Sequence, residues 1–468
     1  MHPHRRLTAL TGVGVLLLTA CANTPDDRDV GPEDEATRAV PIPEGGGSDA
    51  RHDVNGDGFP DLLFTSTYNG TGPEDSLPGI GRLVVVYGSE AGPEPTTRTV
   101  IDAEDMLAIA DVGDGQRLRP GTADLDGDGF DDIPVLDAAS ASRAGEAAVI
   151  WGGPTGPDPD AAPTPVAMPE EDDPGRSWGG SYTAPVPGDF DGDGNADVVA
   201  VEEADTGEDL SRLTVLYGPF DRDGAPQRSA RLTVDARLGG LVSAEADGTG
   251  PTPLLLRHGA DGEQPANTLF TTGPADPGEW ESVDLPAGGL SVFGDFDGDG
   301  ATDVAIGDDG TRNDEPGYET ESDEVHRQLH VYHGAVGERA PEHSSMTLPG
   351  EDGSVPSYPL RTMVAGDLDG DGSDELAVGL DGRGVDVVRD TGTGLEADDA
   401  SPLVRADPEK GADGRVARAF AFGDYDGDGS DELVLAVDRG TFPAAPVLWW
   451  VTDGSADEGS FSSESFTG

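Results

Sequence analysis

The sequence predicts an all-β fold, a seven-bladed β-propeller made of four-stranded antiparallel blades. Two observations point to it. A nine-residue acidic pattern recurs at intervals of 50 to 72 residues, and short apolar runs typical of strands follow each copy. Repeats of this length each form one supersecondary unit that is stabilised by stacking on its neighbours. Four strands per repeat, arranged radially, leave only short and protected sheet edges.

The composition agrees with many short strands. Gly (69) and Pro (38) are frequent among the 468 residues, which argues against long helices, while 35% of residues are hydrophobic and can fill a divided core. The net charge of −65 argues against nucleic-acid binding, because the phosphate backbone would be repelled. The single cysteine, Cys21, excludes a disulfide framework and a cysteine-ligated metal site.

The amino terminus reads as a targeting signal. Arg5 and Arg6 precede an apolar run of about 12 residues that ends in Leu18-Thr19-Ala20-Cys21. This run is too short to span roughly 30 Å of hydrocarbon as a helix. The layout resembles a bacterial lipoprotein signal peptide, which implies removal of residues 1–20 and lipid modification of Cys21. An ordinary secretory signal with a chance cysteine is the alternative.

The resemblance to a lipoprotein places the chain on the extracytoplasmic face of the cell membrane. No other segment has 18 consecutive apolar residues, so we expect the membrane to be contacted through the lipid anchor alone. Residues 21–37 begin with Cys21 and continue as a polar, acidic, Pro-containing stretch, which predicts a disordered tether. The propeller is expected over residues 38–468.

The pattern D-x-[DN]-G-D-G-x-x-[DE] defines the repeats and occurs six times. A seventh copy, EADGTGPTP, has lost most of its acids and starts at Glu245. Without that copy, one interval would be about twice the others, so the spacing predicts seven units. The six intact copies start at Asp53, Asp124, Asp189, Asp295, Asp367 and Asp424.

Each repeat carries strand signals in the same order. An apolar segment such as DLLF or DVVAV follows the acidic loop, and a second one ends in an aromatic residue and Gly, as in RLVVVYG (82–88). A weaker third signal follows, as in ARLTVDA, and another strand enters the loop. The aromatics Tyr87, Trp151, Tyr217 and Tyr332 are expected to pack between blades. Residues 36–44 (ATRAVPIPE) resemble the third signal, so we expect them to pair with the last blade and close the ring; closure by residues 460–468 is the alternative.

The acidic loops have the chemistry of calcium ligands. Ca²⁺ takes six to eight oxygen ligands, preferably carboxylates and carbonyls. Positions 1, 3, 5 and 9 of the pattern supply side-chain oxygens and position 7 a backbone carbonyl, while Gly at positions 4 and 6 permits a positive φ. We predict about six structural calcium ions, with these ligands: Asp53, Asn55, Asp57, Phe59, Asp61; Asp124, Asp126, Asp128, Phe130, Asp132; Asp189, Asp191, Asp193, Asn195, Asp197; Asp295, Asp297, Asp299, Ala301, Asp303; Asp367, Asp369, Asp371, Ser373, Glu375; Asp424, Asp426, Asp428, Ser430, Glu432.

Two other readings of these loops are less favoured. An EF-hand needs a bidentate Glu at position 12 and flanking helices. Position 12 is instead apolar in every copy, and chance cannot explain six near-identical copies at quasi-regular spacing. The position-12 residues are Phe64, Val135, Ala200, Ile306, Val378 and Leu435.

The degenerate copy lacks the closing carboxylate, because Pro253 stands at position 9. We therefore expect Glu245, Asp247 and Thr249 to bind no ion.

These loops, with the apolar strand that follows, resemble FG-GAP (VCBS-type) repeats, as in the seven-bladed head of integrin α chains. The resemblance implies a propeller with calcium held in hairpins on one face and partners contacted by loops of the other. The Phe-Gly and Gly-Ala-Pro signatures are poorly kept, so the chain is closer to the broad bacterial branch. Integrin-specific partners therefore do not carry over.

No catalytic motif stands out. The chain lacks G-x-S-x-G, H-E-x-x-H and phosphate-binding patterns. His326, His330 and His333 fall on alternate faces of one strand, so they are not expected to share a metal. Two insertions, 66–81 with Tyr68 and 308–324 with Tyr318, are candidate contact loops, although tolerated solvated loops explain them better.

The function these observations favour is a monomeric, non-catalytic binding or scaffolding module for an extracellular protein or glycan. The alternative is an enzyme acting on extracellular polysaccharide, such as a lyase. A lyase would need a base and a cationic group at the propeller axis. With one lysine, Lys410, and scattered arginines, the sequence predicts no such cluster.

Overall fold

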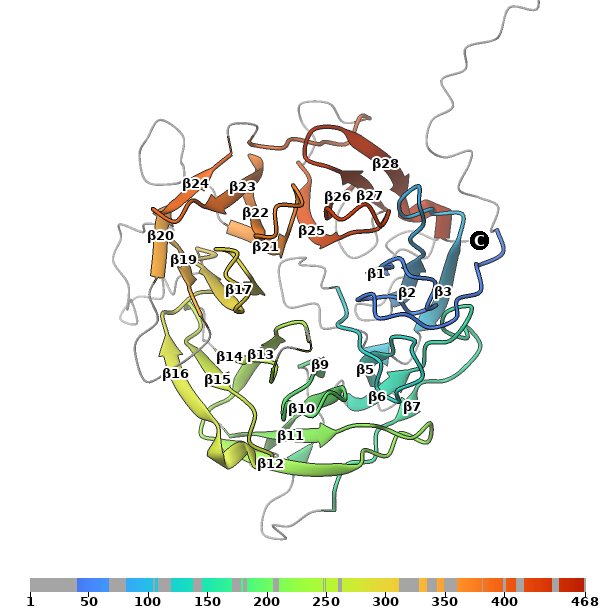
Figure 1. Ribbon diagram of the computed structural model, residues 1–468, viewed down its shortest axis with the longest axis vertical. Coiled ribbons are helices and arrows are strands. Elements are labelled where there is room, and N and C mark those ends of the chain that lie inside the picture. Colours follow the sequence, from blue (N-terminus) through green and yellow to red (C-terminus); the bar gives the residue numbers. More distant parts are fainter. Residues whose placement is uncertain are drawn as a thin grey trace, which may run out of the picture. The chain divides into compact units, whose positions relative to one another are not determined.

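The computed structural model contains seven antiparallel sheets arranged around an axis (Figure 1). Within the described residues no α-helix occurs, and two short 3-10 helices, η1 (Pro277–Glu279) and η4 (Ser463–Phe466), are present. The described residues are 40–66, 81–103, 106–107, 119–137, 145–170, 178–179, 183–204, 210–246, 248, 250–259, 263–310, 328–334, 343–348, 360–380, 382–398, 401–409, 416–439 and 446–466. The predicted signal peptide, Cys21, the tether, Tyr68, Tyr318, His326 and Lys410 lie outside them.

The first three sheets are numbered as blades 1 to 3 in chain order. Blade 1 contains β1 (Leu62–Ser66), β2 (Gly81–Val86) and β3 (Arg98–Ala103). Blade 2 contains β4 (Met106–Leu107), β5 (Ile133–Asp137), β6 (Glu146–Ile150) and β7 (Thr164–Pro165). Blade 3 contains β8 (Trp178–Gly179), β9 (Val186–Gly188), β10 (Asp197–Ala204), β11 (Ser211–Tyr217) and β12 (Arg228–Val234).

The remaining four sheets, blades 4 to 7, each have four strands in sequence order. Blade 4 contains β13 (Leu238–Ser243), β14 (Leu254–His258), β15 (Asn267–Thr271) and β16 (Glu281–Leu285). Blade 5 contains β17 (Leu290–Gly294), β18 (Asp303–Gly307), β19 (Gln328–Tyr332) and β20 (His343–Thr347). Blade 6 contains β21 (Leu360–Gly366), β22 (Glu375–Leu380), β23 (Gly384–Asp390) and β24 (Leu395–Ala397), and blade 7 contains β25 (Arg418–Gly423), β26 (Glu432–Asp438), β27 (Val447–Thr452) and β28 (Asp457–Ser462).

The predicted strand order is confirmed. In blades 4 to 7 the acidic segment connects the first and second strands, and the degenerate copy joins β13 to β14. The first strand is incomplete elsewhere. Blade 1 has three strands among the described residues, and β8 and β9 both pair with the same strand, β10, in blade 3. In blade 2, β4 pairs with the far end of β5, and an isolated bridge joins Ala123 to Asp132.

The core is divided into seven hydrophobic clusters, one between each pair of neighbouring blades. Alternation along each central strand sends side chains to both sides. In β1, Leu63 packs towards blade 2, whereas Leu62 and Phe64 pack towards blade 7. Both faces are therefore buried, which explains why these strands read as continuous apolar runs. Tyr87, Tyr217 and Tyr332 are buried in such clusters and Trp151 packs against one, as predicted.

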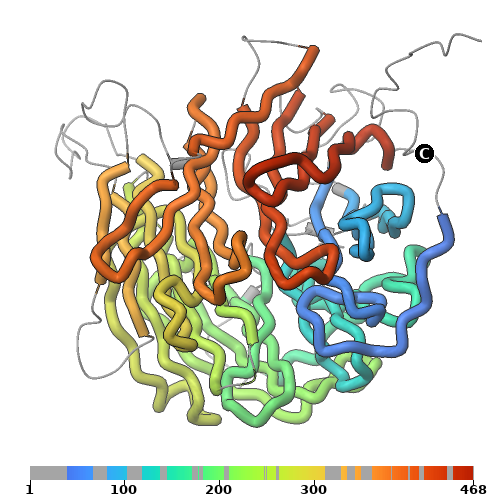
Figure 2. The backbone as a smooth tube through the Cα atoms, turned by 45° about the horizontal axis from the view of Figure 1, so that its top comes forward, coloured from blue at the N-terminus to red at the C-terminus, as the bar shows by residue number. Residues whose placement is uncertain are grey.

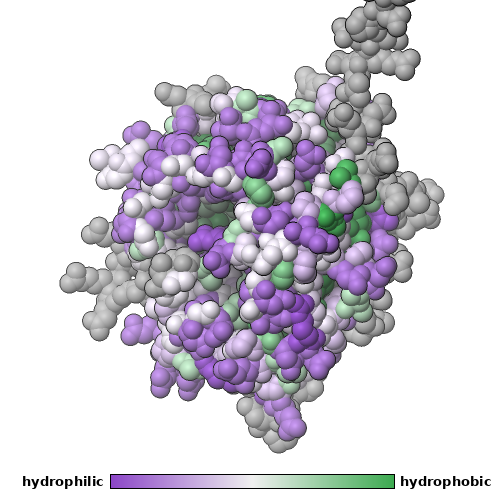
Figure 3. All heavy atoms as spheres, turned by 45° about the vertical axis from the view of Figure 1, so that its right-hand side comes forward, coloured by the Kyte–Doolittle hydropathy of each residue, from purple (hydrophilic) through white to green (hydrophobic). Residues whose placement is uncertain are grey.

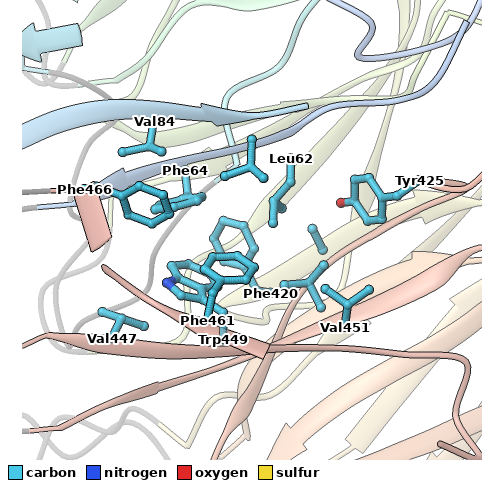
Figure 4. Packing of buried hydrophobic residues seen from close by; sticks show 13 residues of the cluster. Leu62, Phe64, Val84, Phe420, Tyr425, Val447, Trp449, Val451, Phe461 and Phe466 are labelled. Carbon is cyan, nitrogen blue, oxygen red and sulfur yellow. The ribbon is translucent and has the colours of Figure 1, made fainter. Parts of the chain in front are cut away.

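The ring closes by side-chain packing between blades 7 and 1, and the prediction of a closing strand from residues 36–44 is wrong. Residues 40–44 form no strand, and the Val40 N–H donates to Thr96 O of blade 1. The outer position of blade 7 is taken by β28, from the carboxyl terminus (Figure 2). Its Phe461 packs with Phe64 of blade 1 and Trp449 of blade 7 (Figure 4). A fourth strand from the carboxyl-terminal segment thus takes the place in blade 7 that was predicted for the amino-terminal segment.

Candidate functional site

The six intact acidic loops share one backbone conformation. In every copy the glycines at positions 4 and 6 have a positive φ, between 67° and 97°. This confirms the reason predicted for glycine at these positions, because other residues adopt that region at a cost. The apolar residue at position 12 lies in a strand in all six copies and is buried. The EF-hand alternative is thus excluded by structure as well as by sequence.

The position-1 carboxylate organises the interior of each loop. In the first loop, Asp53 Oδ1 accepts the N–H groups of Gly56 (2.7 Å) and Asp57 (3.2 Å), and Asp53 Oδ2 accepts that of Gly58 (2.7 Å). The loop at Asp189 repeats this arrangement, with Asp189 accepting from Gly192, Asp193 and Gly194. The chain therefore curls around position 1, which brings the other acidic side chains to the same concave side.

The position-9 carboxylate is buried and joins the loop to the rest of its blade. Asp132 Oδ2 accepts the N–H of Leu125 (3.0 Å), and Asp132 Oδ1 accepts that of Gly152 (2.8 Å), which follows the second predicted strand segment. A Cβ at Gly152 would lie 2.3 Å from Asp131 O, so only glycine fits there. The recurring aromatic-Gly signal thus contains a donor to the metal loop, a role that the sequence did not reveal.

Burial raises the pKa of the position-9 acids, and it has a larger effect than repulsion between the carboxylates. The pKa rises to about 8 for Asp132 and for Glu432, to about 7 for Asp197 and for Glu375, and to about 6 for Asp303. In the absence of a cation these groups therefore hold their protons to a higher pH than exposed carboxylic acids do. A bound divalent ion would favour the charged form and offset this cost.

Acidic oxygens come close enough to share an ion in several loops. Oxygens of Asp124, Asp126 and Asp132 all lie within 4.8 Å of one another, as do those of Asp189, Asp191 and Asp197. The same holds at positions 1, 3 and 5 of the loops that start at Asp295 and Asp367. Two further acceptor atoms, Asn55 Oδ1 and Asp424 Oδ1, are buried without a hydrogen-bond partner. An oxygen-rich concave loop with unsatisfied acceptors fits a hard divalent cation.

Basic side chains from neighbouring segments contact four of the six loops. Arg222 contacts Asp126 and Asp128, Arg228 contacts Asp191, and Arg389 contacts Asp369 and Glu375. In blade 5 the partner is a histidine. These cations compensate part of the negative charge of the loops.

The two described histidines of β19 and the turn after it have different surroundings, and His333 could share an ion with Asp297 and Asp303; the prediction that the histidines share no metal stays a prediction. His333 Nδ1 lies 3.3 Å from Asp303 Oδ2 and 3.5 Å from Asp297 Oδ2, and His333 Nε2 lies 3.1 Å from Asp390 Oδ2. His330 instead stacks on Tyr332. The contact of His333 with a predicted metal loop was not foreseen, because it depends on where the turn after β19 ends.

Hydrogen bonds from the residue at position 8, which the pattern leaves variable, also join neighbouring loops. Asp431 Oδ2 accepts the Asp367 N–H (3.0 Å) while the Asp431 N–H donates to Asp367 O (2.7 Å). Asp374 makes the same pair with Asp295, and Thr252 of the degenerate loop makes it with Asp189. The degenerate loop thus keeps its structural link to blade 3 although positions 5 and 9 are no longer acidic.

A cavity of about 650 Å³ occupies the axis and is lined by residues from all seven blades. Glu245, position 1 of the degenerate loop in blade 4, lies in its wall with Arg51 and His52 of blade 1. Glu245 Oε2 is 2.8 Å from Arg51 Nη1, and Glu245 Oε1 is 2.8 Å from His52 Nε2. Glu245 therefore joins blades 1 and 4, which two other blades separate, and the absence of an ion at the degenerate loop stays a prediction.

His52 reaches the cavity through an unusual backbone conformation. It is the one non-glycine residue with a positive φ (60°) among those described. Its N–H donates to Asp131 Oδ2 (2.8 Å), and its Nδ1 lies 2.9 Å from Thr122 Oγ1. Burial lowers the pKa of His52, and Arg119 lowers it further, against an opposing effect of Glu245. Local strain of this kind is common at functional sites.

The expectation that no cationic cluster forms at the axis is wrong. Arg51, His52 and Arg119 lie in the cavity wall with Glu245, and Arg257 enters it from β14. One signal was present in the sequence. The residue before each acidic loop is Gly or Ala in the other six repeats but His52 in the first. Its meaning could not be derived, because blades 1 and 4 meet at the axis only when the ring is closed.

The comparisons with known proteins identify no family. No protein-family profile matches the chain, and no curated protein sequence does either. Among solved structures, the crystal structure of cobalt-substituted Synechocystis ACO aligns over 91% of this chain and 94% of that chain, at 10% identity and a TM-score of 0.42. A similarity this distant carries no inference about activity. In the part of the chain that the structure describes, no helix has the length and apolar character needed to cross a membrane.

Proposed function

We propose that the six acidic loops bind calcium and that the chain is an FG-GAP-like (VCBS-type) propeller whose ions are structural. The observation that supports this most directly is the grouping of carboxylate oxygens within 4.8 Å of one another in glycine-turned hairpins between strands. The ligands would be the thirty residues at positions 1, 3, 5, 7 and 9. When bound, each ion would compensate part of the negative charge of its loop and cross-link the two strands that flank it.

Removing one acid should remove one ion. Asp126→Ala or Asp297→Ala is expected to lower the bound calcium from six ions to five, and to reduce the melting temperature without altering the other sites. Equilibrium dialysis or native mass spectrometry measures the stoichiometry. Asp284→Ala, on the exposed outer strand β16, is the matched control and should keep six ions. Six ions in the loop variants would contradict the assignment.

We propose that the chain is a lipoprotein attached through Cys21 to the extracytoplasmic face of the cell membrane. The support is the sequence of the amino terminus, which lies outside the described residues. Cys21→Ser is expected to move the protein from the membrane fraction to the soluble fraction, because the lipid would be its only attachment. Fractionation of cells expressing either form tests this, and persistence of the variant in membranes would contradict it.

We propose a non-catalytic role for the propeller, as a monomer that binds an extracellular protein or glycan. Hydrophilic residues dominate the face seen in Figure 3, and Val40 and Val404 are the large hydrophobic side chains exposed within the described residues. Within the described residues, this face shows no broad apolar patch of the kind that marks a permanent interface. Screening the protein against cell-wall glycans and co-purifying surface proteins tests this role.

The axial group of Arg51, His52, Arg119 and Glu245 favours a second candidate, an enzyme acting on extracellular polysaccharide. It brings a possible base and cationic side chains to one cavity. Incubation with uronate-containing polysaccharides, monitored by ultraviolet absorbance for a new double bond, tests a lyase. A signal that disappears in His52→Ala and Glu245→Gln would favour the enzyme over the binding module.

A further inference from the structure

We propose that the axial cavity binds a carboxylated saccharide, with Arg119 and Arg257 contacting its carboxylates and Glu245 acting as an internal competitor. The inference rests on the proposed binding role and names its site and ligand class. It holds whether or not the acidic loops take calcium. The volume of about 650 Å³ lies within the range of roughly 300–1000 Å³ typical of small-molecule sites.

The cavity wall holds two guanidinium groups that have no carboxylate partner within 4 Å among the described residues. Arg119 Nη1 and Nη2 donate to the carbonyl oxygens of Phe422 (2.7 Å) and Asp61 (3.2 Å). Arg257 Nη1 donates to Gly289 O (2.8 Å). In each side chain the Nε atom is buried without an acceptor. Buried N–H groups without an acceptor are unfavourable, and an anionic ligand would add to the partial compensation that Glu245 gives Arg119 and Asp309 gives Arg257.

The lack of acidic partners is unusual on this chain. The protein has 93 acidic residues, and Arg212, Arg222, Arg389 and Arg405 each lie within 4 Å of a carboxylate. Asp309 is the acid whose charge acts on Arg257. Burial lowers the pKa of Arg257, and Asp309 raises it by a smaller amount. Asp309 is itself held by Gln264 Nε2 at 2.5 Å. Among the described residues, Glu245 and Asp309 act on these two arginines from beyond ion-pair distance, so an external anion can still pair directly with either guanidinium group.

The backbone of blade 4 makes room for Arg257 to reach the cavity. Gly240 lies on the innermost strand, β13, where the pairing with β14 is irregular between Leu238 and Gly240. A Cβ at Gly240 would lie 2.7 Å from Arg257 Nη2, so the guanidinium passes over the glycine. Any larger residue at this position would displace the side chain from the cavity wall.

Glu245 shows how the same cavity holds a carboxylate. Its two oxygens are bound at 2.8 Å by Arg51 and by His52, and Arg119 lies close enough to lower its pKa further. The carboxylate of Glu245 therefore already engages part of the cationic charge of the wall. A negatively charged ligand meets repulsion from Glu245, and removal of that charge should favour binding.

Isothermal titration of the full chain in calcium-containing buffer tests the inference, with digalacturonate as the probe and the uncharged disaccharide of the same linkage for comparison. We expect digalacturonate to bind and the neutral disaccharide to bind at least about tenfold more weakly. Arg119→Gln and Arg257→Gln should each weaken digalacturonate binding by about tenfold or more, whereas Glu245→Gln should strengthen it by about threefold or more. Arg257→Lys, which keeps the charge, should retain part of the affinity. Arg405→Gln removes an ion pair with Asp457 outside the cavity and should change nothing.

Opposite effects of the arginine and Glu245 variants cannot come from general destabilisation, and melting temperatures of all variants check folding. Equal binding of the charged and neutral disaccharides, or affinity unaffected by both arginine variants, overturns the inference. Acetate and phosphate that bind as tightly as digalacturonate would show an unspecific anion site and overturn the ligand class. Calcium stabilisation without digalacturonate binding refutes this inference alone, and the reverse result refutes the calcium assignment alone.

Discussion

Chelation of calcium is expected to lower the melting temperature of this protein by on the order of 10 °C or more. One site contributes about 2.7 kcal/mol when free calcium is a hundredfold above its dissociation constant, so six independent sites contribute about 16 kcal/mol. For a large domain, each kcal/mol shifts the melting temperature by roughly 1–2 °C or more. Calorimetry with and without a chelator measures the difference. Readdition of Ca²⁺ should restore the original value.

After chelation, the stability of the protein should also depend on pH in the opposite direction. Burial raises the pKa of the position-9 acids to between about 6 and about 8 in Asp303, Asp197, Glu375, Asp132 and Glu432. Between the unfolded pKa of about 4 and these values, the folded state binds more protons than the unfolded state, so metal-free stability falls as pH rises from about 5 to 8. Calcium needs the ionised carboxylates, so the loaded protein should instead lose its calcium-dependent stability as pH falls. An unchanged melting temperature on chelation would refute the structural role of calcium.

Trp449→Ala should be the most damaging single substitution at the junction of blades 7 and 1. Trp449 is fully buried, with its ring 4.4 Å from that of Phe64 in blade 1 and 4.9 Å from that of Phe420 in blade 7 (Figure 4). Truncation of a buried Trp costs about 3–5 kcal/mol in the free energy of unfolding. The ring is closed here by side chains without a shared strand, so the loss falls on the junction itself. Denaturant unfolding measures the change.

Trp449→Phe is the matched control. The indole Nε1 is buried with no hydrogen-bond partner, so phenylalanine keeps much of the apolar contact and removes an unsatisfied donor. We expect a cost below about 1.5 kcal/mol for this variant. If Trp449→Ala were as stable as Trp449→Phe, the blade 7–blade 1 packing would not be what holds the ring closed.

Much of the fold could be predicted because it follows from the regular succession of apolar segments and acidic loops along the chain. The apolar segment DVAIG became β18, QLHVYHG contains β19, and the degenerate copy at Glu245 stands between β13 and β14 as the spacing required. Glycines at positions 4 and 6 predicted the loop conformation, because the ability of glycine to adopt a positive φ does not depend on the rest of the fold. The incomplete inner strands of blades 1 to 3 were not predicted, since pairing there depends on contacts with the neighbouring blades.

The amino-acid sequence alone thus determined the seven repeating units and the six hairpins with grouped acids. The repeats and the hairpins both depend on contacts between residues that are close in sequence. Tertiary structure alone decided how the ring closes, with Phe461 and Trp449 against Phe64 in place of an amino-terminal strand. It also decided what meets at the axis, where Glu245 contacts Arg51 and His52 across 193 or 194 residues of sequence. Such contacts form only when all seven blades are stacked, and no local pattern encodes them.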